Sequence, residues 1–395
     1  GPIGVSSGNY QDKLSSSFYQ ACVDTGAEPN DDYNIKFEGV GWLQYSVKNG
    51  IRSSTSSYIK SIRKYKNFQI EIKSEVEKII FDGNKAIGVL YKSNNILKKV
   101  TANAEVILAA GPINSPKILE LSGIGDANLL KSFGIKPKYN LPGVGENLTD
   151  HLQTRITYET NLKVTVNDIL NNKFRGALSL LRYIFKRDGL MSIASATVQS
   201  IMKSDPSLTH PDLKVQLMLI SGQNRYARNK KIGLDSFPGF SVGVFPIYPS
   251  SRGSTHIKSK KTSDPPVIKA GYLSDEKDRN LTVKGLRLVR KIMSQSSISK
   301  YIVREVRPGQ NIQDDRELLN YARQNGQTSW HAISTCRMGK NKMDVVNHDL
   351  EVYGTQNLRV IDSSIMPNMP TSNTNVPSIV IGEKGADLIL EKAEK

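Results

Sequence analysis

Apolar residues along this chain follow two different periods, which separate strand-rich from helix-rich stretches. From Phe68 the positions alternate in FQIEIK, and EVEKIIF, a turn at 82–85 and AIGVLYK follow, which predicts an antiparallel sheet. Residues 104–110 (AEVILAA) have the composition of a buried strand. The Ser115-Pro116 pair then predicts the start of a helix that ends at Gly123 and Gly125.

Helical periodicity dominates between residues 151 and 325, in GALSLLRYIFKRDGL and NLTVKGLRLVRKIMSQSS, and it also predicts a short helix over 14–25. The segments VQLMLIS and FSVGVFPIYP are strand-like and lie between the two long helical stretches. After Gly326 the pattern predicts a strand, a Pro-rich loop and a helix from Val376 to the end. The fold class is therefore α/β (α+β), with more than one packed lobe in 395 residues.

Composition narrows the class of protein only slightly. Hydrophobic residues make up 38% of the chain, as in globular proteins, and no apolar run is long enough to predict a membrane span. The formal charge of +17 is compatible with a polyanion binder, whose retention on heparin would depend strongly on salt. The basic residues are dispersed and not interleaved with aromatic residues, so we favour a solvated basic face and no nucleic-acid partner.

Several other classes of site are disfavoured by spacing. Cys22 and Cys336 are too few for a zinc site; two free thiols are the favoured interpretation, and a single bridge stays open. His210, His256 and His348 are isolated, so we predict no metal, and the chain lacks the G-x-S-x-G elbow of Ser-His-Asp hydrolases. No leader is visible, and the compartment is unknown, with secretion weakly favoured; two Asn-Leu-Thr sequons would accept glycan in a secreted protein.

Three motifs together resemble the glucose-methanol-choline (GMC) oxidoreductase family. GPINSPKILELSGIG (111–125) is similar to the second family signature, and LPGVGENLTDH (141–151) is similar to its PGVGxNLxDH segment, with Thr149 in place of the usual Gln. HAISTCRMG (331–339), with NLRVIDSSIMP and SNTNVPSIVIGEKGADLI after it, resembles the carboxyl-terminal catalytic module. YPSSRGSTHIKS also fits, and within the family the insect glucose dehydrogenase branch is the most similar.

The resemblance implies an FAD-binding lobe of the GMC type, discontinuous in sequence, beside a substrate-binding lobe with an antiparallel sheet and helices. It assigns 1–66 to a connecting or cap part of the substrate lobe, 67–150 to the FAD lobe, 151–325 to the substrate lobe, and 326–395 to a catalytic FAD-lobe segment. The G-x-G-x-x-G turn of a nucleotide-binding fold is absent, since 143–148 lacks the third glycine. We therefore expect an amino-terminally incomplete flavoprotein, the alternative being a natural variant without that fold.

The same resemblance suggests the catalytic residues. His331 stands at the family's base position, and a histidine suits removal of a hydroxyl proton while hydride leaves for the flavin. Asn373 stands at the partner position, where an amide can stabilise a developing alkoxide. The simpler interpretations are a buried histidine satisfied by backbone and, for the Asn-Thr-Asn run, a turn and helix cap.

The cofactor residues also follow from the resemblance. Val76 matches a position whose backbone contacts adenine, and Asp362, which a strand-ending turn would equally explain, matches one near the ribityl and pyrophosphate groups. Asn375, Val376 and Pro377 match the element beside the isoalloxazine. Weaker candidates, whose role is structural in the alternative interpretation, are Gly111, Asn114, Asn147 and Asp150, while His151 is expected to shape the structure.

The predicted function is FAD-dependent oxidation of an alcohol or sugar hydroxyl, similar to glucose dehydrogenase, with a quinone or oxygen as electron acceptor. The alternative is a catalytically silent relative or fragment that keeps the fold without FAD.

Overall fold

The computed structural model describes residues 1–8, 10–222 and 233–394. Its chain divides into two compact units, each assembled from three segments. The first unit contains residues 1–68, 152–246 and 276–327, and the second contains 69–151, 247–275 and 328–395. Helices and strands occur in both units, so the expected mixed α/β class is confirmed.

The first unit is built on an antiparallel sheet whose described strands have the order β18-β12-β15-β14-β13-β2, with β19 (Gln327–Thr328) also paired to β12. Thr154 faces Val244 across β12 and β15, and Val215 faces Val244 across β14 and β15, which sets the register. All eight residues of β15 are buried, as expected for a strand with neighbours on both edges. The strand bounds are Ile302–Arg307 (β18), Leu152–Thr160 (β12), Gly239–Pro246 (β15), Leu213–Met218 (β14), Ala196–Met202 (β13) and Gly39–Trp42 (β2).

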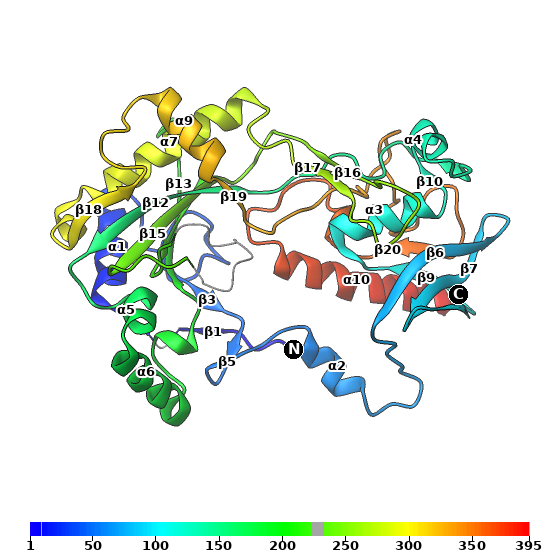
Figure 1. Ribbon diagram of the computed structural model, residues 1–395, viewed down its shortest axis with the longest axis horizontal. Coiled ribbons are helices and arrows are strands. Elements are labelled where there is room, and N and C mark those ends of the chain that lie inside the picture. The colour runs from blue at the N-terminus through cyan, green and yellow to red at the C-terminus, as the bar shows by residue number, and fades with distance from the viewer. Residues whose placement is uncertain (9, 223–232, 395) are drawn as a thin grey trace. The chain divides into compact units, whose positions relative to one another are not determined.

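Helices cover the sheet of the first unit and complete its core (Figure 1). Leu286 on α7 is fully buried, and a Cβ built on the neighbouring Gly285 would lie 2.9 Å from a methyl of Val244. Glycine at this position therefore lets α7 approach β15 closely. The helices are α1 (Lys13–Asp24), α7 (Glu276–Met293), α8 (Ser296–Ser299) and α9 (Asp315–Asn325).

Smaller elements complete the first unit. Thr165 and Asp168 form a capping box at the start of α5, and Asn172 caps α6. The α6 helix ends at Lys186, and the cap residue after it, Arg187, has a left-handed backbone (φ 53°). These elements are α2 (Ser56–Ile62), α5 (Val166–Asn171), α6 (Lys173–Lys186), the 3-10 turn η1 (Leu190–Ser192), and the pairs β1 (Ser6–Ser7) with β3 (Gln44–Tyr45) and β4 (Val47–Lys48) with β5 (Ile51–Arg52).

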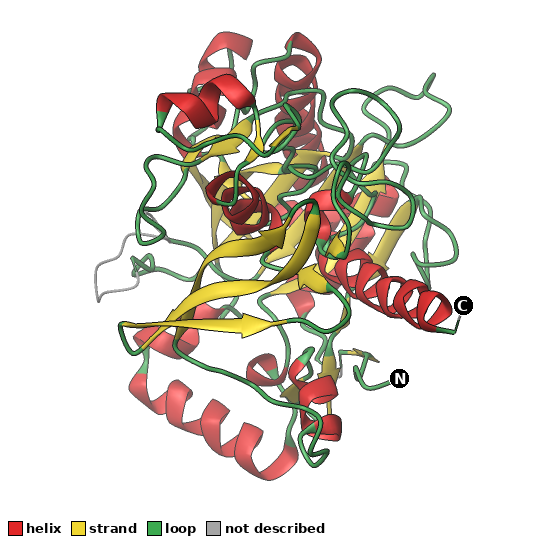
Figure 2. Ribbon diagram, turned by 90° about the vertical axis from the view of Figure 1, so that its right-hand side faces the viewer, coloured by secondary structure: helices red, strands yellow, loops and turns green. Residues whose placement is uncertain are grey.

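The second unit combines a three-stranded antiparallel sheet with a parallel strand pair (Figure 2, long strands in yellow). β6 (Ser74–Asp82), β7 (Lys85–Ser93) and β8 (Ile96–Thr101) form the sheet, while β9 (Val106–Leu108) pairs in parallel with β20 (Leu358–Val360). Around them lie α3 (Gly111–Leu121), α4 (Ala127–Ser132), α10 (Asn375–Ala393), the 3-10 turn η2 (Ser363–Ile365), and the pairs β10 (Ile124–Gly125) with β11 (Tyr139–Asn140) and β16 (Ser254–His256) with β17 (Val267–Lys269).

The α3 helix tolerates an internal proline because a side chain from elsewhere completes its hydrogen bonds. Pro116 has no N–H, so the carbonyl of Pro112 cannot receive its usual helical bond. The hydroxyl of Thr335 donates to that carbonyl at 2.6 Å. The structure thus corrects the helix start expected at Ser115, because α3 begins at Gly111 with Pro112 in its first turn.

Two further predictions are wrong in position. FQIEIK does not form a strand: it has no paired neighbour, and its alternating Ile70 and Ile72 are 50% and 71% exposed. Alternation alone does not create a strand without a partner edge. The stretch 151–325 is also not continuous within one unit, because residues 247–275 pack in the second unit.

A partly buried cluster of one histidine and two carboxylates binds residues 247–275 to the rest of the second unit. His256 Nδ1 lies 2.7 Å from Glu120 Oε1, and its Nε2 lies 3.0 Å from Glu146 Oε1. The side chain of Glu120 is fully buried and also accepts the backbone N–H of Ile257 at 2.8 Å. Three separate stretches of sequence therefore meet at one imidazole.

Truncation of Leu286 tests the packing of the first unit. Leu286→Ala leaves a cavity beneath α7, and we expect it to lower the free energy of unfolding by about 2–5 kcal/mol. Lys284→Ala on the exposed side of the same helix should change it by less than about 0.5 kcal/mol. Urea denaturation of both variants measures the difference, and equal midpoints would contradict the packing described.

The His256 cluster predicts a pH-dependent stability. Burial lowers the pKa of His256, but Glu120 and Glu146 together outweigh burial, so its pKa is raised above the ordinary 6.5. The stabilisation is fully present below pH 6.5 and is lost as pH rises through the folded-state pKa. Melting temperature should therefore fall over that upper range in the wild type, and less steeply in His256→Gln. His348→Gln, whose side chain is 80% exposed, serves as the control; identical slopes in wild type and His256→Gln would refute the assignment.

Candidate active site

His331 lies in a short irregular segment that is held on both sides by backbone hydrogen bonds. Ser329 N–H donates to the His151 carbonyl at 3.0 Å, and Ile333 N–H donates to the Thr149 carbonyl at 3.0 Å. Trp330, between them, has a left-handed backbone (φ 57°), a conformation rare for a bulky residue and typical of constrained functional segments. The imidazole that follows is 7% exposed.

The structure places a second histidine against His331. The two Nδ1 atoms of His151 and His331 lie 3.0 Å apart, with the rings nearly perpendicular (89°). His151 Nε2 lies 2.8 Å from the carbonyl oxygen of Ile247. His151 is therefore part of the site itself.

With both rings neutral, these contacts assign one proton to each ring. A carbonyl only accepts, so His151 Nε2 must carry the proton that it donates to Ile247. In the neutral ring, His151 Nδ1 is then an acceptor, and His331 Nδ1–H donates to it. In the neutral ring of His331, Nε2 is consequently the nitrogen that carries no proton.

The carboxylate of Asp150 holds the backbone of both histidines in place. Its Oδ1 accepts the backbone N–H groups of His151 at 2.8 Å and His331 at 2.9 Å. Its Oδ2 accepts the hydroxyl groups of Tyr272 and Thr328. Burial, followed by the charge of Asp150, raises the pKa of the Tyr272 phenol, which keeps it a donor. A buried carboxylate with four donors is well compensated.

The sequence alone did not predict the roles of Asp150, His151 and Tyr272 in this arrangement. Asp150 was only a weak flavin-lobe candidate, and His151 was expected to have a structural role. The Asp-His pair that closes LPGVGENLTDH was the signal that could have pointed to both. Tyr272 has no motif around it and could be found only through the fold.

The predicted catalytic Asn373 and the predicted flavin-contacting residues lie at the beginning of α10. Asn373 and Asn375 are exposed, Val376 is 60% exposed, and α10 begins at Asn375. Thr374 makes no side-chain capping bond there. The N–H groups of Asn375 and Val376 therefore lie at the positive end of the dipole of a nineteen-residue helix, while Pro377 has no N–H.

The carboxylate of Asp362 accepts hydrogen bonds from groups within the protein. Its Oδ2 accepts Gly111 N–H at 3.0 Å and the Ser115 hydroxyl at 2.5 Å, and its Oδ1 accepts Ser364 N–H at 2.7 Å. The carboxylate thus connects the end of the β20 strand region to the start of α3. Both oxygens have donors within the chain, as the strand-ending interpretation expects.

The other cofactor candidates are scattered through the second unit. Val76 lies on β6 opposite Tyr91, next to a register shift, and packs against the unit's core. Asn147 has a left-handed backbone, and its side-chain Nδ2 is buried without an acceptor among the described residues. Gly111 also has positive φ (80°), and a Cβ built on it would meet nothing within 4 Å. Asn114 is part of the first turns of α3.

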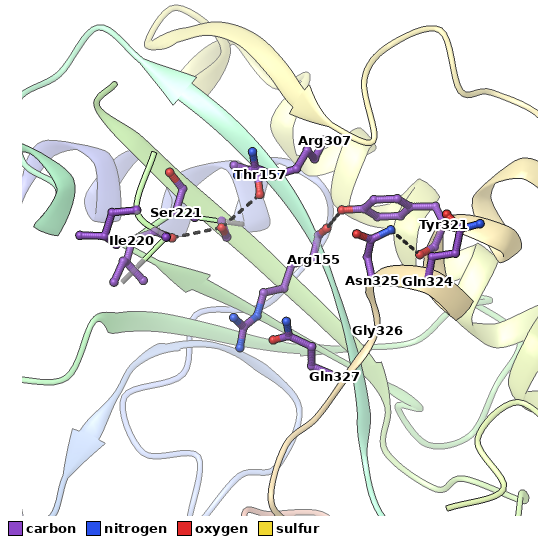
Figure 3. Close-up of a pocket in the computed structure, with 14 residues that line it drawn as sticks. Arg155, Thr157, Ile220, Ser221, Arg307, Tyr321, Gln324, Asn325, Gly326 and Gln327 are labelled. Carbon is purple, nitrogen blue, oxygen red and sulfur yellow. Dashed lines mark hydrogen bonds between the residues drawn. The ribbon is translucent and has the colours of Figure 1, made fainter. Parts of the chain in front are cut away.

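A polar pocket of about 440 Å³ lies within the first unit (Figure 3). Arg307 pairs with Asp235 (2.5 and 3.1 Å), and Arg155 Nε donates to Gln153 Oε1 at 2.7 Å. Gln327 Oε1 is buried and accepts no bond from the described residues. No carboxylate is among the described residues that line the pocket. Other polar linings are Thr157, Ser221, Ser241, Tyr321, Gln324 and Asn325.

Comparison with known proteins places the chain in a family. A family model described as GMC oxidoreductase matches residues 1–153, and another with the same description matches 249–382. An alcohol dehydrogenase [acceptor] of Pseudomonas putida is 35% identical over 398 residues, covering 100% of this chain and 71% of that protein. An oxygen-dependent choline dehydrogenase of Staphylococcus haemolyticus is 37% identical over 397 residues, covering 99% and 69%.

Solved structures show the same fold. An FAD-dependent oxidoreductase from Chaetomium thermophilum matches with a TM-score of 0.88 at 25% identity, covering 100% of this chain and 74% of that one. A formate oxidase matches with a TM-score of 0.91 at 21% identity, covering 100% and 73%. The chain belongs to the GMC oxidoreductase family. It is an FAD-dependent oxidoreductase that acts on CH–OH groups.

The described residues fit a flavin. The uncapped start of α10 presents N–H groups and a positive dipole end, which suit the electron-rich edge of a reduced flavin. The open space at Gly111 and the buried Nδ2 of Asn147 provide room and an unused donor in the same unit. Asp362, in contrast, would support the cofactor through α3 rather than by direct contact.

The cysteines, the metal-ligating side chains and the apolar helices can be described briefly. Cys22 and Cys336 are free and buried, and burial raises the pKa of both thiols. Among the described residues, no cluster of three or more His, Cys, Asp or Glu could hold a metal. Within that same part of the chain, no helix is long and apolar enough to cross a membrane.

Replacing Asp150 tests whether it orders the histidine pair. Asp150→Asn keeps one oxygen for the two N–H groups but turns an amide toward Tyr272 and Thr328, so His331 should shift. We expect flavin reduction by an alcohol to slow by about a hundredfold. Stopped-flow absorbance measures this rate. Tyr272→Phe, which removes one donor only, should cost less than about tenfold. A folded Asp150→Asn variant with the wild-type rate would show that Asp150 does not position His331 for the reaction.

Proposed function

We propose that His331 Nε2 is the base that removes the hydroxyl proton of the alcohol substrate. The observation that carries this proposal is the chain of contacts from the Ile247 carbonyl through His151 to His331 Nδ1. With both rings neutral, that chain makes Nε2 the unprotonated nitrogen of His331. Burial of the imidazole and its fixed backbone keep the lone pair in one direction, which favours proton transfer.

The proton taken from the hydroxyl makes His331 an imidazolium. The proton on Nδ1 then strengthens its bond to His151 Nδ1, since a charged donor bonds more strongly than a neutral one. The bond from His151 Nε2–H to the Ile247 carbonyl is strengthened in turn, and His151 keeps its own proton. When bound, FAD accepts the hydride that leaves the carbon.

Asn373 is proposed to hold the substrate oxygen. Its amide can donate to a developing alkoxide and does not titrate, which separates its task from that of the base. Asn375, Val376 and Pro377, at the first turn of α10, are proposed to contact the flavin ring, and the helix dipole would stabilise negative charge on the reduced ring. Val76 is proposed to meet the adenine.

For the substrate, we favour a sugar or another polyhydroxylated alcohol, as in a glucose dehydrogenase. The pocket of the first unit offers hydroxyl, amide and guanidinium groups and no carboxylate among its described lining, which suits several hydroxyls better than a quaternary ammonium. We therefore propose that this pocket of the first unit binds polyhydroxylated molecules. A quinone or oxygen would serve as the electron acceptor.

The experiment uses the full natural polypeptide purified with its flavin. Under anaerobic conditions glucose, other sugars, primary alcohols and choline are added in turn, and flavin absorbance is followed. Bleaching by a sugar or a simple alcohol supports the substrate class, whereas bleaching by choline alone would overturn it. Reoxidation by air or by a soluble quinone then distinguishes the acceptors.

His331→Gln tests the base. We expect the rate of bleaching to fall by about a hundredfold to ten-thousandfold, because the amide cannot accept the proton. The flavin spectrum of the oxidised variant should be unchanged. His348→Gln, at an exposed histidine of the same unit, is the matched control and should keep the wild-type rate. A His331→Gln rate within about tenfold of wild type would remove His331 from the role of base.

A further inference from the structure

The α6 helix packs on the first unit with its polar side. None of its residues is buried, and its partly buried positions are Arg175, Gly176, Ser179 and Tyr183, which follow helical spacing on one face. The Tyr183 hydroxyl donates to the Gly50 carbonyl at 3.1 Å, so the helix is attached to the β4–β5 turn. Amphipathic helices of globular proteins ordinarily do the opposite and bury their apolar side.

The apolar side of α6 consequently faces outward. Phe174, Leu178, Leu181 and Phe185 follow one another at intervals of four, three and four residues, which places them in a single stripe. Their exposed fractions are 72%, 51%, 49% and 80%. Leu170 in α5, with Leu180 and Ile184 in α6, are also exposed and widen the stripe. We call these seven residues the α6 apolar face. Contiguous exposed apolar area of this kind marks an interaction surface.

The charges around the α6 apolar face have one predominant sign. The helix sequence KFRGALSLLRYIFK contains four basic residues and no acidic one, and Arg187 follows directly. Between residues 163 and 189 there are six basic side chains and two carboxylates. One of those carboxylates, Asp188, is paired with Arg182 at 2.6 Å. Lys173 and Lys186 stand at the two ends of the helix, both exposed.

We propose that the α6 apolar face is a docking surface for an anionic lipid membrane, on which the helix lies parallel to the surface. An apolar stripe bordered by lysine and arginine matches acyl chains below and phosphate groups above. The long basic side chains can extend to the headgroups while the phenylalanine rings enter the acyl boundary. The overall charge of +17 attracts the whole chain to such a surface.

A second copy of the chain fits this surface less well. In a symmetric contact the helix would face another helix with the same four basic residues and no carboxylate, so the flanking charges would repel. An anionic membrane instead compensates these charges. Attachment of this kind requires no membrane-spanning segment.

Vesicle flotation tests the proposal. The flavin-loaded full polypeptide is mixed with vesicles of phosphatidylcholine containing about one-third phosphatidylglycerol, and with pure phosphatidylcholine vesicles. We expect binding to the anionic vesicles that weakens at high salt. Phe174→Ser with Phe185→Ser should lower the partition coefficient by about a hundredfold. Lys173→Gln with Lys186→Gln should lower it by about fivefold for each charge removed.

A matched control distinguishes membrane binding by the α6 apolar face from nonspecific binding by exposed apolar residues. Ile35→Ser with Val303→Ser removes two exposed apolar residues elsewhere in the first unit, 88% and 57% exposed, and should leave binding unchanged. Circular dichroism and bound flavin confirm that each variant is folded. If the wild type fails to float, or if the control loses binding equally, the proposal is wrong. Dimers in sedimentation that the phenylalanine variants dissolve, without vesicle binding, would assign the face to a second copy instead.

Discussion

The site depends on one buried charge, the carboxylate of Asp150. Backbone N–H groups of both histidines share one of its oxygens, and two hydroxyls share the other. Hydrogen bonds to an ionised acceptor are roughly twice as strong as neutral ones, so four of them offset much of the cost of burying the charge. Because Asp150 and His151 are adjacent, the same short segment supplies both the acceptor for His331's backbone and the acceptor for its ring.

The discontinuity of the second unit follows from the need to bring three distant segments to one place. Residues 141–151 supply Asp150 and His151, 247–275 supply Tyr272 and the Ile247 carbonyl, and 328–338 supply His331. The His256 cluster and the Thr335 bond to α3 fasten the same three segments away from the histidines. Each crossing is closed by buried or partly buried polar contacts, which require defined geometry and therefore favour one arrangement.

The sequence predicted what local periodicity and turn chemistry control. α7, α10 and the β6–β7 hairpin appear where the apolar spacing and the 82–85 turn placed them. FQIEIK failed because a strand needs a neighbouring edge, which alternation does not report. The start of α3 was missed because a hydroxyl far along the chain compensates Pro116. Tyr272 was missed for a similar reason: its partner Asp150 is close only in the folded chain.

The relay from Ile247 to His331 has a consequence for anyone who wishes to re-engineer the site. The proton arrangement assigned to the two neutral rings depends on a main-chain carbonyl, a group that no side-chain substitution can remove. Side-chain substitutions around the histidines therefore leave this acceptor in place. Insertions or deletions that move the backbone at position 247 are the changes that would take it away from His151 Nε2.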